Sequence, residues 1–155
     1  SGRTQEIQRL IGRSLRSIVD LSILKDIQIL IDCDVIQADG GTRTASITGS
    51  FVALSICINK LLSQKKISIS PIYENLAAVS CGVINNESYL DLDYEEDQGA
   101  EVDANFVMTE SGKLVEIQMT SEEKLCSEEN FLKMLSLAKN GINDLIKVQK
   151  NMSLI

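Results

Sequence analysis

The stretch DGGTRTASI, residues 39–47, decides how this chain is organised, because it joins two segments with different periodicities. Residues 27–37 before it mostly alternate apolar and polar side chains, and they predict a β-strand. Residues 43–63 are small or apolar and predict a buried helix. The two glycines therefore fall at a strand-to-helix turn, where the first N–H groups of the helix have no partner within it.

This turn has the chemistry of a phosphate site. Gly40 and Gly41 lack the Cβ atoms that would keep a ligand from the backbone, and the helix dipole favours an anion there. Thr42 or Thr44 can offer a hydroxyl, and Arg43 can offer a bidentate fork. The same pattern also fits a plain glycine turn capped by threonine beside a surface arginine. A small-molecule kinase is a further alternative, although the lysine motif of a P-loop is missing.

A second polar group, DLDYEEDQGAEVD at residues 91–103, is strongly acidic. Its first residues end a predicted strand over 88–94, and a returning strand is predicted over 102–109 after a bend at Gln98-Gly99. This path can bring Asp97 and Asp103 together at one end of a sheet. Two carboxylates there can bind a hard cation or act as acid and base, whereas a solvated acidic loop is the alternative interpretation.

Together the two groups resemble ribonuclease PH. The resemblance rests on SGRTQEIQRLI at the start, on IDCDVIQADGGTRTASITG, and on LDLDYEED followed by AEVDAN, all in the family's order. Members of that family are phosphorolytic 3′ exoribonucleases, or tRNA nucleotidyltransferases. They trim tRNA precursors with inorganic phosphate and release nucleoside diphosphates. The resemblance covers essentially the whole chain and implies a ribonuclease PH-like fold.

The resemblance also implies roles for individual residues. Those that would bind phosphate are Arg3, Gly41, Thr42 and Arg43. Asp97 and Asp103 would be the active-site carboxylates and would hold magnesium. RNA is then the expected partner, with roles in tRNA and rRNA processing, and the expected assembly is a ring of dimers, a hexamer.

Two features depart from the family pattern. Family chains carry a substantial segment before the Ser-Gly-Arg motif, so we expect residues 1–155 to be a single catalytic domain forming the C-terminal part of a longer fold. After VEIQ at 115–118 the family usually continues GTAEG, whereas this chain continues MTSEE. Losing both glycines can reshape a loop near the active site, which keeps open a non-catalytic ring subunit that binds RNA or partners.

Composition narrows the chemistry further. The 155 residues include no histidine, which excludes a histidine-based triad or metal site. Four cysteines without C-x-x-C spacing indicate free thiols in a reducing, cytoplasmic compartment. A net charge of -7 excludes the broad positive surface of a general nucleic-acid binder. The longest uncharged run, residues 44–59, is shorter than a membrane span, so no membrane association is expected.

The remaining periodicity predicts an α+β domain in which a mixed β-sheet is packed with helices. Hairpin turns are expected at Asn85-Asn86 and at Glu110-Ser111-Gly112. Helices are expected over 4–19, 43–63 and 127–150, and strands over 27–37, 76–84, 88–94, 102–109 and 113–120.

Overall fold

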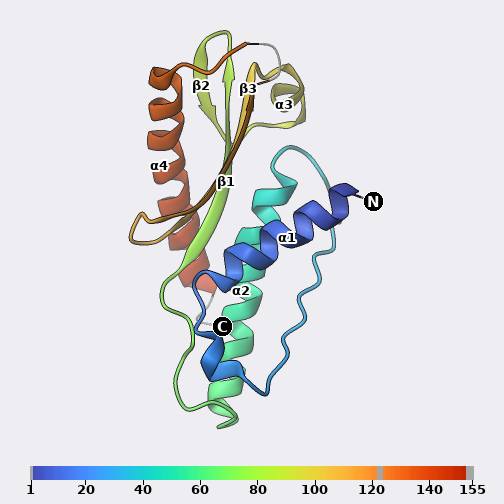
Figure 1. Ribbon diagram of the computed structural model, residues 1–155, viewed down its shortest axis with the longest axis vertical. Helices are drawn as coiled ribbons and strands as arrows, with labels where there is room; N and C mark the ends of the chain where they lie inside the picture. The colour runs from blue at the N-terminus through green and yellow to red at the C-terminus, as the bar shows by residue number, and fades with distance from the viewer. Residues whose placement is uncertain (1, 122–123, 153–155) are drawn as a thin grey trace.

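The computed structural model describes residues 2–121 and 124–152, apart from the side chain of Arg3. Its elements are α1 (Gly2–Arg16), the short 3-10 helix η1 (Leu21–Leu24), α2 (Thr42–Ser63), β1 (Leu76–Ile84), β2 (Glu87–Leu90), α3 (Tyr94–Gly99), β3 (Val102–Thr109), β4 (Leu114–Ser121) and α4 (Glu128–Met152). The strands form one sheet in the order β2-β1-β3-β4, and each pairing is antiparallel. In Figure 1, α4 covers one face of this sheet and α2, with α1 against it, lies on the other. The predicted α+β fold is confirmed.

Both predicted hairpins form. Asn85 and Asn86 have φ angles of 51° and 65°, the pair of left-handed residues that a two-residue type I′ turn requires. At the other turn Gly112 has φ 81°, and its N–H donates to Thr109 O at 2.9 Å. These turns fix the register of the strands that carry the site.

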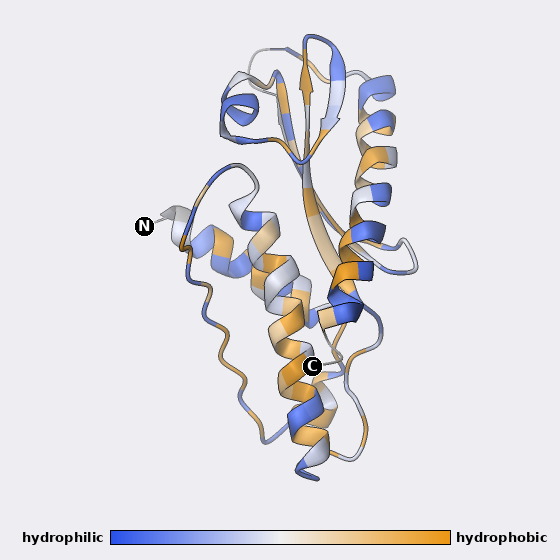
Figure 2. Ribbon diagram, turned by 180° about the vertical axis from the view of Figure 1, so that it is seen from behind, coloured by the Kyte–Doolittle hydropathy of each residue, from blue (hydrophilic) through white to orange (hydrophobic). Residues whose placement is uncertain are grey.

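Alternate residues of the two central strands face separate cores. On these two strands the side toward α4 is apolar, and Figure 2 shows hydrophobic residues along the helix that covers it. On the side toward α2, apolar residues such as Leu76, Ala78 and Val107 occupy only one end of the strands. Polar residues therefore occupy the other end of that side, close to the start of α2.

Hydrogen bonds fix α2 against the sheet. Thr48 Oγ1 accepts from Ala78 N at 3.0 Å and donates to Ala78 O at 3.1 Å. Gln149 Nε2 donates to Thr48 O and Leu76 O, so α4 ties both elements together. By length and composition α2 also meets the criteria for a membrane span, as the core helices of many soluble proteins do. The absence of membrane association therefore stays a prediction.

The predicted strand over residues 27–37 is wrong. Figure 1 shows this segment as a long extended trace beside α1 and α2, and it pairs with no strand in the described part of the chain. The alternating pattern still separates a buried side from an exposed one. Ile27, Ile29 and Ile31 pack toward the core, while Leu30 is 79 % exposed. An alternating pattern marks two faces, but a strand also needs a neighbour for its backbone hydrogen bonds.

The strand predicted over 88–94 is too long. β2 ends at Leu90, and Asp91 then turns the chain with φ 59°. Asp93 begins the short helix α3 with a capping box, in which its carboxylate accepts from Glu96 N at 2.8 Å and Glu96 accepts from Asp93 N at 3.0 Å. This reciprocal cap outweighed the alternating pattern on which the longer strand was predicted.

Candidate active site

The glycine turn leaves the N-terminal end of α2 without a side-chain cap. Gly41 is the N-cap residue in the left-handed region, with φ 69° and ψ 20°, and it has no side chain to cover the helix end. The Thr44 hydroxyl donates to Gly41 O at 2.9 Å, and this hydrogen bond fixes the conformation of the turn. The first N–H groups of a 22-residue helix thus remain directed at the space before it, where the dipole favours an anion.

The turn is locked against the start of α3. Asp39 Oδ1 accepts from Gly40 N at 3.0 Å and from Tyr94 N at 2.7 Å. A Cβ added at Gly40 would lie 1.9 Å from Leu92 O, so glycine is needed for the two backbones to pack this closely. The predicted anion site and the acidic segment therefore form one rigid unit.

A pocket of about 430 Å³ lies where these elements meet the sheet. Residues 38–43 form one wall, and Tyr94 and Asp97 of α3 form another. Side chains of the sheet complete it, namely Ser80, Asp103 and Asn105. The structure thus brings the predicted residues Gly41, Thr42, Arg43, Asp97 and Asp103 to one place.

The two carboxylates reach this pocket from different elements. Asp97 is exposed on α3, and its N–H donates to Asp93 O at 2.9 Å. Asp103 is partly buried on β3, opposite Gly82 of β1 and Thr120 of β4. Thr120 belongs to the segment that departs from the family pattern, so that departure lies directly beside Asp103. Residues 122 and 123 of the same segment lie outside the described residues.

Arg43 is oriented from α1. Its Nη1 lies 3.8 Å from Glu6 Oε1, and Gln118 Nε2 donates to the same oxygen at 2.8 Å. A separation of 3.8 Å exceeds hydrogen-bond range, so this ion pair steers the guanidinium without occupying its donors. The backbone of Arg3 lies in the first turn of α1, but its side chain is outside the described residues and its predicted role is not tested.

Asp97 and Asp103 are the residues of the pocket that could hold the predicted magnesium ion. Magnesium is usually bound by one or two carboxylates together with substrate phosphates and water. Asp97 and Asp103 provide such a pair beside an anion-binding helix end. Across residues 2–121 and 124–152, no group of three or more Asp, Glu or Cys residues forms a site made by protein ligands alone.

Cysteine chemistry is disfavoured at this site. Cys81 lies on β1 but faces the opposite core, and burial is the main cause that raises its pKa to about 12. The neighbouring carboxylates Asp91 and Asp103 add to that shift. The thiol stays protonated at neutral pH and is a poor nucleophile. All four cysteines are free, as predicted, and Cys33 is exposed.

Sequence reasoning did not single out Ser80, Asn105, Asp39 or Tyr94 as part of the site. Ser80 did leave a signal, because it is a polar residue inside the apolar run LAAVSCGVI. The contact between Asp39 and Tyr94 has no such signal in the sequence, because the two residues are 55 positions apart.

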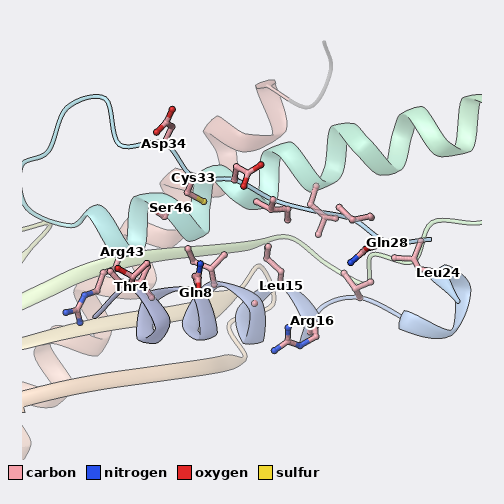
Figure 3. A pocket seen from close by; sticks show the side chains of 18 of the residues that line it. Thr4, Gln8, Leu15, Arg16, Leu24, Gln28, Cys33, Asp34, Arg43 and Ser46 are labelled. Carbon is pink, nitrogen blue, oxygen red and sulfur yellow. The ribbon is translucent and has the colours of Figure 1, made fainter. Parts of the chain in front are cut away.

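A larger groove of about 1090 Å³ lies beside the pocket, between α1 and residues 27–35. Figure 3 shows Leu15 and Leu24 along it, with Thr4 and Arg43 at one end. Thr42 and Arg43 line both hollows, so the groove leads to the pocket that holds the carboxylates.

The fold and pocket define an α+β domain in which a glycine turn at a helix start lies beside two carboxylates. Residues 1–58 match the model of the 3′ exoribonuclease family, domain 1, and residues 75–141 match domain 2 of the same family. The chain belongs to this 3′ exoribonuclease family, and its resemblance to ribonuclease PH is confirmed.

Curated relatives are similar along nearly the whole chain. Ribonuclease PH of Neisseria gonorrhoeae is 60 % identical over 151 residues, which are 97 % of this chain and 62 % of the relative. Ribonuclease PH of Methylobacterium nodulans is 58 % identical over 150 residues, or 97 % of this chain and 63 % of the relative. The chain therefore spans less than two thirds of the length of these relatives.

Solved structures share the fold at low identity. Rice Rrp46 superposes with a TM-score of 0.72 at 17 % identity, covering 100 % of this chain and 68 % of that one. The archaeal exosome core gives a TM-score of 0.70 at 18 % identity, covering 96 % and 64 %.

Proposed function

We propose that this chain carries the active site of a phosphorolytic 3′-to-5′ exoribonuclease. Its similarity to proteins named ribonuclease PH supports this activity. The single observation that carries the proposal is the pocket that joins the start of α2 to Asp97 and Asp103. An anion site beside two carboxylates supplies the groups needed to hold phosphate and to manage the proton of a leaving oxygen.

In this reaction, an oxygen of inorganic phosphate bonds to the phosphorus of the last nucleotide. The bond from that phosphorus to the 3′ oxygen of the preceding nucleotide breaks, and this oxygen takes a proton. The products are a nucleoside diphosphate and an RNA that is one nucleotide shorter. Gly41, Thr42 and Arg43 hold the attacking phosphate, with Arg3 as a further cationic ligand.

The carboxylates act at the other side of the scissile bond. Asp97 either donates the proton to the departing oxygen or joins Asp103 in holding magnesium. When bound, magnesium neutralises charge on the substrate phosphates. Positioning and charge stabilisation supply most of the catalysis in transfers of this kind.

The substrate class that we propose is the 3′ end of RNA, in tRNA precursors and also in rRNA processing. The protein acts in the cytoplasm, as a hexameric ring of dimers, and without a membrane partner. A chain with net charge -7 cannot hold a long RNA by broad electrostatic attraction. Arginines near the pocket and on neighbouring subunits of the ring therefore contact the RNA backbone.

One assay tests the activity. The protein is incubated with a short RNA, magnesium and inorganic phosphate, and the released nucleotide is identified. Nucleoside diphosphates are expected. Monophosphates would indicate hydrolysis instead, and the absence of any product would favour the scaffold or kinase alternatives, which the family membership does not support.

Replacing the proposed phosphate ligand sharpens the test. Arg43→Ala should remove roughly 2–4 kcal/mol of transition-state stabilisation, because a preorganised charged donor is lost. The loss should appear mainly as weaker use of phosphate. Arg9→Ala, which removes an exposed arginine from α1, is the matched control. Equal phosphate dependence in the two variants would contradict the assignment of Arg43.

A further inference from the structure

One of the residues that line the pocket, Ser80, carries a buried hydroxyl without a partner among the described residues. Ser80 is only 3 % exposed, and its Oγ makes no hydrogen bond within residues 2–121 and 124–152. By contrast, the fully buried Ser14 donates from Oγ to Leu10 O at 2.8 Å. An unpaired buried hydroxyl costs free energy, so its persistence in a pocket indicates a group that a ligand satisfies.

Ser80 lies next to the glycine turn. A Cβ placed on Gly41 would lie 3.6 Å from Ser80 Oγ, 3.3 Å from Thr44 Oγ1 and 3.7 Å from Asp91 Oδ1. These three oxygen atoms therefore pack close to the α-carbon of Gly41, where the side chain of a larger residue would crowd them. The oxygen atoms are therefore gathered at the anion-binding end of α2.

Asp91 is tied to Ser80 just past the end of the β1–β2 ladder. Cys81 pairs with Leu90 in the antiparallel ladder, and Asp91 N donates to Ser80 O at 2.8 Å. Asp91 itself has a left-handed backbone with φ 59°, so its side chain leaves the alternation of the strand. The Ser80 hydroxyl and the Asp91 carboxylate nevertheless both lie beside Gly41, which places a donor and an acceptor at the start of α2.

We propose that Ser80 and Asp91 together bind hydrogen phosphate, an assignment that rests on the proposed phosphate-dependent activity. Ser80 Oγ donates to an unprotonated phosphate oxygen, and the Asp91 carboxylate accepts from the P–OH group. Inorganic phosphate keeps at least one proton near neutral pH, whereas sulfate keeps none. A carboxylate repels an anion that brings no proton, so the pair selects phosphate over sulfate.

Thermal unfolding with added phosphate or sulfate tests this pair, because a ligand raises the melting temperature according to its concentration and affinity. Ser80→Ala should weaken phosphate binding about tenfold, the scale of one hydrogen bond to a charged group. Without ligand, its melting temperature should not fall, since the lost hydroxyl was unpaired. The control Ser14→Ala should melt earlier and bind phosphate normally, since its hydroxyl is paired and distant from the pocket.

Asp91→Asn tests the acceptor. Asparagine tolerates the left-handed backbone at this position, so the fold should persist. The variant should lose about tenfold of the preference for phosphate over sulfate, because the repelling charge is gone. An unchanged preference would overturn the pairing with Asp91.

The remaining outcomes separate this pair from the proposed activity. Normal phosphate affinity in Ser80→Ala, and in the size-matched Ser80→Cys, would overturn the role of Ser80. Variants that bind as expected in a protein that releases no diphosphates would support the binding pair and refute phosphorolysis. A parent protein that phosphate does not stabilise would overturn both.

Discussion

The two faces of the sheet are built from alternate residues of the same strands, yet they differ in kind. On the two central strands the face toward α4 is apolar, with Val79, Cys81, Ala104 and Phe106 among its buried members. The face toward α2 begins with apolar residues and ends with polar ones. On the two central strands the polar residues that line the pocket are Ser80, Asp103 and Asn105.

This difference shows how a small domain can tolerate a polar pocket. Polar groups in a partly buried pocket cost free energy until a ligand satisfies them. The uninterrupted core on the opposite face offsets that cost and fixes the strands in register. Substitutions on the pocket face should therefore change binding and turnover, while those on the α4 face should change stability.

The largest expected effect lies on the pocket side. Asp97→Asn should lower turnover by about 10²–10⁴, the range for loss of a proton-transfer group. RNA binding and the melting temperature should stay near those of the parent, because Asp97 is exposed. Single-turnover kinetics and a binding titration measure both. Near-parental turnover in a folded variant would remove Asp97 from the proposed chemistry.

Phe106→Ala tests the opposite face. Phe106 is fully buried, and its ring centroid lies 6.4 Å from that of Phe131. Its loss should cost about 3–5 kcal/mol of unfolding free energy, because a large cavity opens in the core. Urea denaturation measures this, with the exposed Leu114→Ala as control. A loss of phosphate affinity in the folded variant as large as that in Arg43→Ala would contradict the division between the faces.

Gly40→Ala tests the link between the glycine turn and α3. Because the new Cβ would meet Leu92 O, the backbone has to shift, and misplacement by about 1 Å can cost about 10² in rate. Gly99→Ala is the control, since nothing lies within 4 Å of a Cβ at that position. Turnover should fall in the first variant and hold in the second. Equal turnover in both would show that the close approach is dispensable.

The smallest expected effect is a pH dependence of stability that arises at Glu74, outside both faces of the sheet. Glu74 accepts from Ser111 N at 3.1 Å and from Lys113 Nζ at 2.9 Å, which ties the β3–β4 hairpin to the chain before β1. Hydrogen bonds from Ser111 and then Lys113 lower the pKa of Glu74 from 4.5 to about 2. Its stabilising contribution is present above pH 4.5 and is lost as the pH falls toward 2.

Glu74→Gln should therefore show a shallower decline of melting temperature over that acid range than the parent. Thermal scans at matched ionic strength compare the two proteins, and the difference between them isolates Glu74 from the other carboxylates. Parallel declines would contradict the assigned pKa.

Much of the fold was predictable because its signals are local. The turn at Asn85-Asn86 and the helix beginning at Thr42 each depend on residues close in sequence. The strand expected over 27–37 does not form, because a strand depends on a non-local signal. A strand needs a partner that can lie far along the chain, as β3 does for β1. Periodicity specifies which side chains are buried, but it does not supply the partner.

The sequence by itself determined the residue types of the site, because a glycine turn with Thr42 and Arg43, followed by spaced carboxylates, is a specific chemical pattern. Only the tertiary structure decided that Asp39 joins the turn to α3 and that the Ser80 hydroxyl, next to Gly41, has no partner among the described residues. Local hydrogen bonds and side-chain periodicity are set within a few residues, whereas a pocket depends on contacts that form only when distant segments pack together.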